Sequence, residues 1–117
     1  MPSVPLVQIE ARAGLTICRI NGELDAFTAP LVREALADAV DAPSLIIDLS
    51  QVRFLDSAGL GVLVGTVRRV RELGGQAILC EASRAVSRAL TTVGMPRIVD
   101  IVSSVGDARR LAGSMQR

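Results

Sequence analysis

Segments with strand character alternate with helical segments over the second half of the chain. Residues 44–49 form an apolar run of strand length, and residues 76–80 and 97–102 form two more. Between these runs, apolar residues recur at helical spacing over 57–73 and again over 83–93. Strand, helix, strand units of this kind pair their strands in parallel through right-handed crossovers. The alternation predicts an α/β fold with a parallel core.

The first half of the chain adds an antiparallel element and one more helix. Residues 4–10 and 15–20 read as two strands joined through a turn that contains glycine, which predicts a hairpin. Pro5 cannot donate to a ladder, so the first strand is expected at a sheet edge. Thr28 is the expected N-cap of a helix that ends at Pro43, whereas residues 22–25 break the strand pattern.

Serine residues mark the expected starts of the last two helices. Ser83 is the N-cap of one, which Gly94 ends, and Ser104 opens the other with Asp107 in a capping box. Gly65, inside the helix over 57–73, is interpreted as a close-packing position. The sequence predicts one domain over residues 1–117, with a mixed sheet of roughly four or five strands and about four helices mainly on one face.

The amino-acid composition excludes most kinds of enzyme active site. There is no histidine, and all 13 basic residues are arginine. Without histidine and lysine, the chain contains no Ser-His-Asp triad, no Cys-His pair, no Schiff-base lysine and no P-loop lysine. Two cysteines without histidine cannot supply the four ligands of a zinc site. We therefore expect no catalytic residue, no metal site and no cofactor; a hydrolase site built on Ser57, Asp56 and Asp48 is an alternative that lacks a base.

The charge balance bears on the kind of partner. The formal net charge is +1 and only 2% of residues are aromatic, which argues against nucleic acid and an anionic membrane. Five arginines could form a nucleic-acid-binding face, but solvated helix faces are the simpler interpretation. They are Arg68, Arg69, Arg71, Arg109 and Arg110. With no signal peptide and no apolar run long enough to span a membrane, a cytoplasmic location is expected.

Cys18 and Cys80 both lie in apolar, strand-like segments. Buried, reduced thiols are the expected state, and a disulfide or a redox switch is the alternative.

The turn before the helix over 57–73 is the strongest candidate for a functional site. Functional residues of alternating α/β sheets gather beyond the carboxyl ends of strands, where helix N-termini point outward. Ser57 begins such a helix, so its hydroxyl either caps the helix or faces a partner. Phe54 and Leu55 are expected to anchor the turn in the core. The chain offers no base to deprotonate Ser57. Its hydroxyl is therefore better suited to being phosphorylated by a kinase on another protein than to acting as a catalytic nucleophile.

Four stretches of the sequence together resemble the STAS domain, and more narrowly the anti-sigma factor antagonists of bacteria. They are Gly22-Glu23-Leu24-Asp25 with Thr28, Ile46-Ile47-Asp48-Leu49, Phe54-Leu55-Asp56-Ser57-Ala58-Gly59-Leu60-Gly61, and Gly74-Gly75. The resemblance extends over essentially the whole chain and implies a small mixed-sheet domain. It also implies binding to an anti-sigma factor that is a serine kinase, and a partner phosphatase that reverses the phosphorylation.

Carried over by position, the phosphorylated residue of that family is Ser57. Members often have a second Ser or Thr directly after it; here that residue is Ala58, which leaves one hydroxyl. The partner surface implied by the resemblance comprises Asp25, Thr28, Asp56, Ser57, Ala58, Gly59, Leu60 and Gly61. Small residues at 58, 59 and 61 would let a partner approach the backbone closely.

One alternative function keeps the same fold. Some STAS-like domains are scaffolds of sensory complexes or accessory subunits of lipid-transport machines, and in these Ser57 would carry no phosphorylation switch. Homodimer formation is left open by the sequence.

Overall fold

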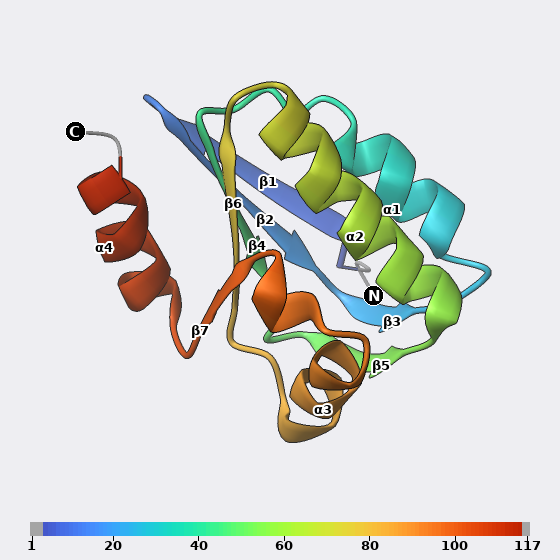
Figure 1. Ribbon diagram of the computed structural model, residues 1–117. Coiled ribbons are helices and arrows are strands. Elements are labelled where there is room, and N and C mark those ends of the chain that lie inside the picture. The colour runs from blue at the N-terminus through green and yellow to red at the C-terminus, as the bar shows by residue number, and fades with distance from the viewer. Residues whose placement is uncertain (1–3, 116–117) are drawn as a thin grey trace.

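A five-stranded mixed sheet forms the centre of the molecule (Figure 1). The computed structural model describes residues 4–115. The strand order is β1-β2-β4-β6-β7, in which β1 and β2 are antiparallel and the remaining pairs are parallel. The strands are β1 (Val7–Arg12), β2 (Leu15–Ile20), β4 (Ser44–Asp48), β6 (Gln76–Cys80) and β7 (Asp100–Val102). The predicted hairpin and parallel core are confirmed.

The helices cover both faces of the sheet unequally. They are α1 (Ala29–Leu36), α2 (Ser57–Glu72), α3 (Arg84–Thr92) and α4 (Val105–Met115). The first three contribute to one large apolar core, and α4 packs on the opposite face against β4, β6 and β7 (Figure 1). The expectation that helices lie mainly on one face is confirmed, with α4 as the exception.

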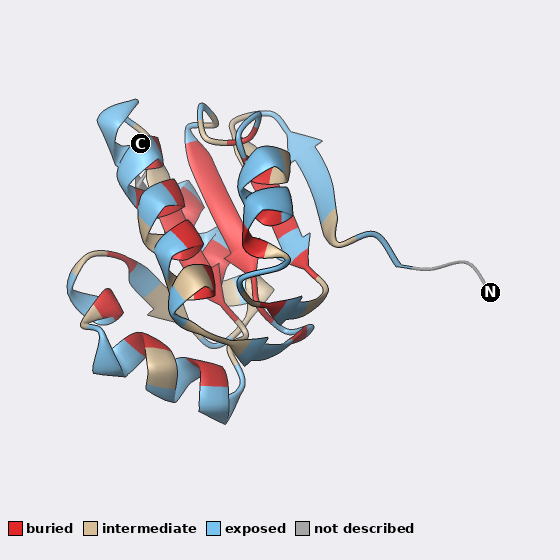
Figure 2. Ribbon diagram, turned by 90° about the vertical axis from the view of Figure 1, so that its right-hand side faces the viewer, coloured by how far each residue is buried: buried red, intermediate tan, exposed pale blue. Residues whose placement is uncertain are grey.

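The central strand β4 explains this two-sided arrangement. All five of its residues are buried, and successive side chains point to opposite faces. Leu45 and Ile47 join the core under α1 and α2, whereas Ile46 joins the smaller core under α4. Figure 2 shows the buried residues gathered in the central strands and on the helix faces turned toward them. The continuous apolar run that predicted a central strand is the consequence of burial on both faces.

A separate two-stranded sheet positions the candidate site. β3 (Gly22–Leu24) pairs in parallel with β5 (Val52–Leu55), beside the ends of the main strands (Figure 1). The prediction that residues 22–25 only break the pattern is therefore wrong. These strands escape sequence analysis because they are three and four residues long, too short for a period of two to show.

Three predicted boundaries also move. β1 begins at Val7, because Pro5 lies outside the ladder that it could not join. The last strand begins at Asp100, because a 3-10 helix, Met95–Arg97, follows Gly94 at a φ of 76°. The helix α1 ends at Leu36 rather than at Pro43, since the chain continues in tight turns such as Ala39 N–H to Leu36 O at 3.0 Å.

Both cysteines are buried free thiols, as predicted. Cys18 faces the core under α1 and α2, and Cys80 faces the core under α4. Burial raises the pKa of Cys18 to about 11, and burial together with the charges of Asp48 and Glu81 raises the pKa of Cys80 to about 12. Neither thiol is therefore activated toward oxidation or metal binding at neutral pH.

Candidate functional site

Two loops meet at the N-terminus of α2. One follows β3 and contains Asp25, and the other follows β5 and contains Asp56. Because β3 and β5 run parallel, both loops leave the small sheet at the same edge. The Asp56 N–H donates to the Leu24 carbonyl at 3.3 Å, which continues the pairing past the end of the strands.

Asp56 is the residue that caps α2. Its backbone is extended, and its Oδ1 accepts a hydrogen bond from the Gly59 N–H at 3.0 Å. Its Oδ2 accepts from the Ala26 N–H at 3.2 Å and so fastens the loop after β3 to the helix. One carboxylate therefore holds the two loops in register.

Ser57 is the first residue of α2, one position after the cap. The interpretation of Ser57 as the N-cap is wrong, because the longer Asp56 side chain already satisfies the amide that a cap would bond. The side chain of Ser57 is exposed, and it makes no hydrogen bond within residues 4–115. The structure places an unused hydroxyl at the positive end of a helix of 16 residues.

Asp25 and Thr28 fold the loop after β3 into a tight turn. The Asp25 carboxylate accepts from the Phe27 N–H at 2.9 Å and the Thr28 N–H at 3.0 Å, while the Thr28 hydroxyl donates to the Glu23 carbonyl at 2.8 Å. The Thr28 amide bond contributes most to holding the pKa of Asp25 below its ordinary value. Thr28 occupies the predicted N-cap position of α1, but its hydroxyl makes no cap bond.

Gly59 faces inward rather than toward a partner. A Cβ on this residue would lie 2.2 Å from the Leu24 carbonyl oxygen, 2.8 Å from Leu24 Cγ and 2.9 Å from a methyl of Leu55. The first turn of α2 therefore rests directly on β3. The expectation that Gly59 leaves room for an outside surface is corrected: its small size serves internal packing.

The remaining predicted partner residues divide by exposure. Ala58 and Leu60 are half-buried and pack against the large core, whereas Gly61 is exposed with open space around its Cα. Gly61, like Ser57, is therefore accessible to a partner at the surface, whereas only part of Ala58 and of Leu60 is accessible.

Exposed apolar side chains surround the site, and the sequence analysis missed them. Phe27 is 90% exposed, Leu31 follows one helical turn later at 57%, and Phe54 is 51% exposed rather than anchored in the core. Phe27 and Phe54 are the two aromatic residues of the chain. Each lies within three residues of Asp25 or Asp56, a coincidence that could have identified them, because exposed aromatic residues are typical of interface anchors.

Asp48 belongs to a different cluster from Ser57. Burial alone would raise the pKa of Asp48, but hydrogen bonds from the Ser50 amide at 2.9 Å and Arg19 Nε at 3.0 Å hold it below its ordinary value. These are structural partners of a buried carboxylate. Asp48 therefore does not form a common site with Ser57 and Asp56, as the alternative of a hydrolase would require.

Intramolecular contacts engage four of the five arginines considered for nucleic acid. Arg69 lies 3.3 Å from Glu72, and Arg71 donates to the Ile98 carbonyl at 2.7 Å. Arg109 lies 3.6 Å from Glu10, and Arg110 pairs with Asp107. These contacts fit the interpretation of solvated helix faces.

The part of the chain that the structure describes contains no cluster of three His, Cys, Asp or Glu side chains at metal-binding distances. In that same part, none of the helices has both the length and the apolar character needed to traverse a bilayer.

Comparisons with known proteins agree with this geometry. The STAS domain family profile matches residues 7–108. An anti-sigma F factor antagonist of Paenibacillus polymyxa is 31% identical over 81% of this chain and 84% of its own length. An anti-sigma-B factor antagonist of Bacillus subtilis is 40% identical over 70% and 76%. An anti-sigma factor antagonist from Mycobacterium paratuberculosis superposes with a TM-score of 0.83 at 28% identity, over 91% of this chain and 92% of that one.

Proposed function

Because the chain belongs to the STAS domain family, we propose that it is an anti-sigma factor antagonist whose binding is switched off by phosphorylation of Ser57. Its partner is an anti-sigma factor with serine kinase activity, and a phosphoserine phosphatase restores the unmodified form. In the unmodified form, binding to the anti-sigma factor releases the sigma factor. The names of the curated relatives support the regulatory class.

One observation carries the proposal. The Ser57 hydroxyl is exposed and unbonded within the described chain, at the start of a helix whose capping is done by its neighbour Asp56. A kinase can therefore approach this oxygen without breaking a hydrogen bond of the fold. The chain itself offers no histidine or lysine to activate the hydroxyl, so the base and the phosphate donor must come from the partner.

A phosphate on Ser57 would leave the fold intact. It adds about −1.5 to −2 charges at neutral pH, and the N-terminus of α2 favours negative charge. The amide of Gly59 stays bonded to Asp56, since the modification does not involve that carboxylate.

The same phosphate would oppose docking. Asp56 is next to Ser57 in the chain, and the loop that contains Asp25 is fastened to Asp56 through the Ala26 amide. A partner shaped around a neutral hydroxyl would therefore meet a dianion on an already acidic surface. Charge mismatch at an interface costs several kcal/mol, and about 4 kcal/mol weakens binding about a thousandfold. The switch is therefore local repulsion at the interface rather than a change of fold.

The surrounding apolar side chains supply the attraction. Phe27, Leu31 and Phe54 extend into solvent around the site, where they have no intramolecular partner to cover most of their surface. Aromatic residues at the centre of an interface contribute a large share of binding energy. We assign them to the partner surface together with Asp25, Thr28, Asp56, Ser57, Ala58, Leu60 and Gly61.

Intact-mass analysis after incubation with ATP and the anti-sigma factor kinase of the same organism tests the proposal. One phosphate is expected on the wild-type protein and none on Ser57→Ala, while Ser83→Ala, which removes a serine at another helix start, is modified normally. Ser57→Asp is expected to bind the kinase far more weakly than wild type does. Wild-type protein that binds the kinase but is never phosphorylated would favour the scaffold function instead.

A further inference from the structure

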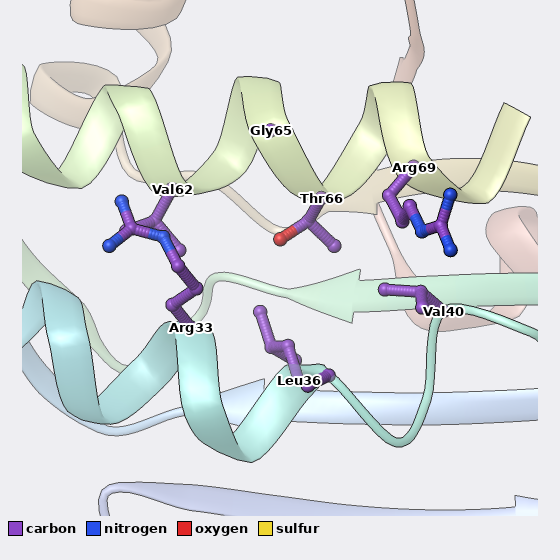
Figure 3. A pocket seen from close by; sticks show the side chains of 8 residues that line it. Arg33, Leu36, Val40, Val62, Gly65, Thr66 and Arg69 are labelled. Atoms are coloured by element: carbon purple, nitrogen blue, oxygen red, sulfur yellow. The ribbon is translucent and has the colours of Figure 1, made fainter. Parts of the chain in front are cut away.

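A groove between α1 and α2 lies away from Ser57, farther along α2. It has a volume of about 370 Å³, within the range of small-molecule sites (Figure 3). Its apolar lining comes from Leu36, Ala37 and Val40 on one side and Val62 on the other.

Gly65 is one of the residues of α2 that line the groove. The sequence predicts a close-packing position for Gly65, but this prediction is wrong, because a Cβ on Gly65 would meet no atom within 4 Å. Gly65 is exposed in the middle of α2, where glycine costs about 1 kcal/mol relative to alanine. The helix therefore carries a destabilising residue at a place where no neighbour requires its small size.

Thr66 supplies a polar group inside the apolar lining. This residue is only 6% exposed, and its side chain points into the groove (Figure 3). Its hydroxyl makes no hydrogen bond with any residue of the described chain, unlike those of Thr91 and Thr92, which bond to the carbonyls four residues earlier. A hydroxyl so placed offers one hydrogen bond to a molecule in the groove.

Two arginines flank the groove, one on each helix. Arg33 of α1 extends over it beside Val62, and Arg69 of α2 lies near its other end (Figure 3). Within residues 4–115, Arg33 makes no ion pair, and Arg69 contacts only the exposed Glu72 at 3.3 Å. In this described part of the chain, Arg33 therefore supplies a positive charge with no ion-pair partner at the rim, whereas the charge of Arg69 is paired with Glu72. Most of the groove's lining between them is apolar.

We infer that this groove binds a small amphiphile with an apolar body and one carboxylate head, such as a medium-chain fatty acid. The apolar tail would lie between Leu36, Val40 and Val62. The Thr66 hydroxyl and the Arg33 guanidinium would bind the head. This inference does not depend on Ser57 or on its kinase.

Titration of the 15N-labelled protein with octanoate, kept below its micellar concentration, tests the inference. Amide shifts are expected to saturate and to centre on residues of α1 and α2 around Gly65. Octanol is expected to bind about tenfold more weakly, because it lacks the charged head. Arg33→Gln is expected to weaken octanoate binding about tenfold and to leave octanol unaffected.

Two glycine variants form the matched control. A Cβ meets no atom within 4 Å at Gly65, which lines the groove, or at Gly113 of α4, which does not line it. Gly65→Leu adds a bulky side chain at the wall of the groove and is expected to abolish binding, whereas Gly113→Leu is expected to leave binding unchanged. Binding that survives Gly65→Leu, equal affinity for octanol and octanoate, or no saturable shift at millimolar octanoate would each overturn the inference. Because Gly65 and Arg33 lie outside the Ser57 surface, phosphorylation of the variants would still report on the proposed function.

Discussion

The capping residue differs between the N-terminus of α2, at the candidate site, and the N-termini of α3 and α4. Ser83 and Ser104 cap α3 and α4, where each hydroxyl accepts from the amide three residues later, Val86 N–H at 3.2 Å and Asp107 N–H at 3.0 Å. At α2, an aspartate performs that task for Gly59.

This difference determines what a serine hydroxyl can do. At α3 and α4 the serine hydroxyl accepts the capping hydrogen bond of its own helix. At α2 the N-cap is Asp56, the residue before Ser57, so the Ser57 hydroxyl takes no part in capping. The third residue differs as well, since α2 has Gly59 where the other helices carry side chains. A surface serine therefore becomes a candidate for modification when its neighbour takes over its structural role.

The largest effect is expected at that third residue. Gly59→Ala would place a Cβ 2.2 Å from the Leu24 carbonyl oxygen and force the first turn of α2 away from β3. We expect a loss of about 3 kcal/mol in the free energy of unfolding, measured by urea denaturation. Gly61→Ala, with open space around it, is the control and is expected to leave stability unchanged or raise it by up to about 1 kcal/mol. Equal stability of the two variants would contradict the close contact.

The cap of α2 is expected to matter more than the caps of the other helices. Asp56→Ala removes the bonds to the Gly59 and Ala26 amides and is expected to cost about 2 kcal/mol in urea denaturation. Asp56→Asn keeps an oxygen for only one of these amides, so its loss is expected to be intermediate. If Asp56→Asn were as destabilising as Asp56→Ala, the carboxylate would not act through two separate bonds.

Alanine substitutions of the three serines are expected to differ in their effect on the free energy of unfolding, measured by urea denaturation. Ser83→Ala and Ser104→Ala each remove a cap bond and are expected to cost about 1 kcal/mol. Ser57→Ala removes no hydrogen bond within the described chain and is expected to change stability by less than about 0.5 kcal/mol. A loss at Ser57 as large as that at Ser83 would erase the contrast between these helix starts.

The smallest effect concerns pH. Hydrogen bonds from backbone amides, that of Thr28 first, lower the pKa of Asp25 in the folded state, so the unfolded state binds more protons in acid. Its contribution is fully present above the unfolded pKa of about 4 and is lost as pH falls through the lower folded pKa. Asp25→Asn is therefore expected to flatten the rise of stability with pH in this acidic window, measured by urea denaturation from acid to neutral pH. An unchanged slope would mean that the carboxylate gains nothing from these bonds.

Sequence patterns were sufficient for the main sheet and for the location of Ser57. The buried run of β4 and the helical period of α2 each span enough residues to be recognised, and the start of α2 locates the turn that contains Ser57. The serine caps of α3 and α4 were also predictable, because capping depends on residues only three positions apart.

Contacts between distant segments were not predictable in this way. Three contacts at the site join residues about 30 positions apart in the chain. They are the pairing of β3 with β5, the hydrogen bond from Ala26 to Asp56 and the packing of Gly59 against Leu24. Sequence rules for caps and for glycine consider one helix at a time. They therefore suggest a cap at Ser57 and close packing at Gly65, although the observed contacts support neither. Hydrophobicity alone predicts Phe54 in the core, whereas the middle of its strand β5 faces solvent.

The contact between Gly59 and Leu24 also bears on the speed of association. A helix start that rests on a carbonyl oxygen, with a second loop fastened to it through Asp56, has little freedom to rearrange before an encounter. A docking protein would meet a preformed template, so the association rate constant would be governed by diffusion and orientation rather than by a slow conformational step.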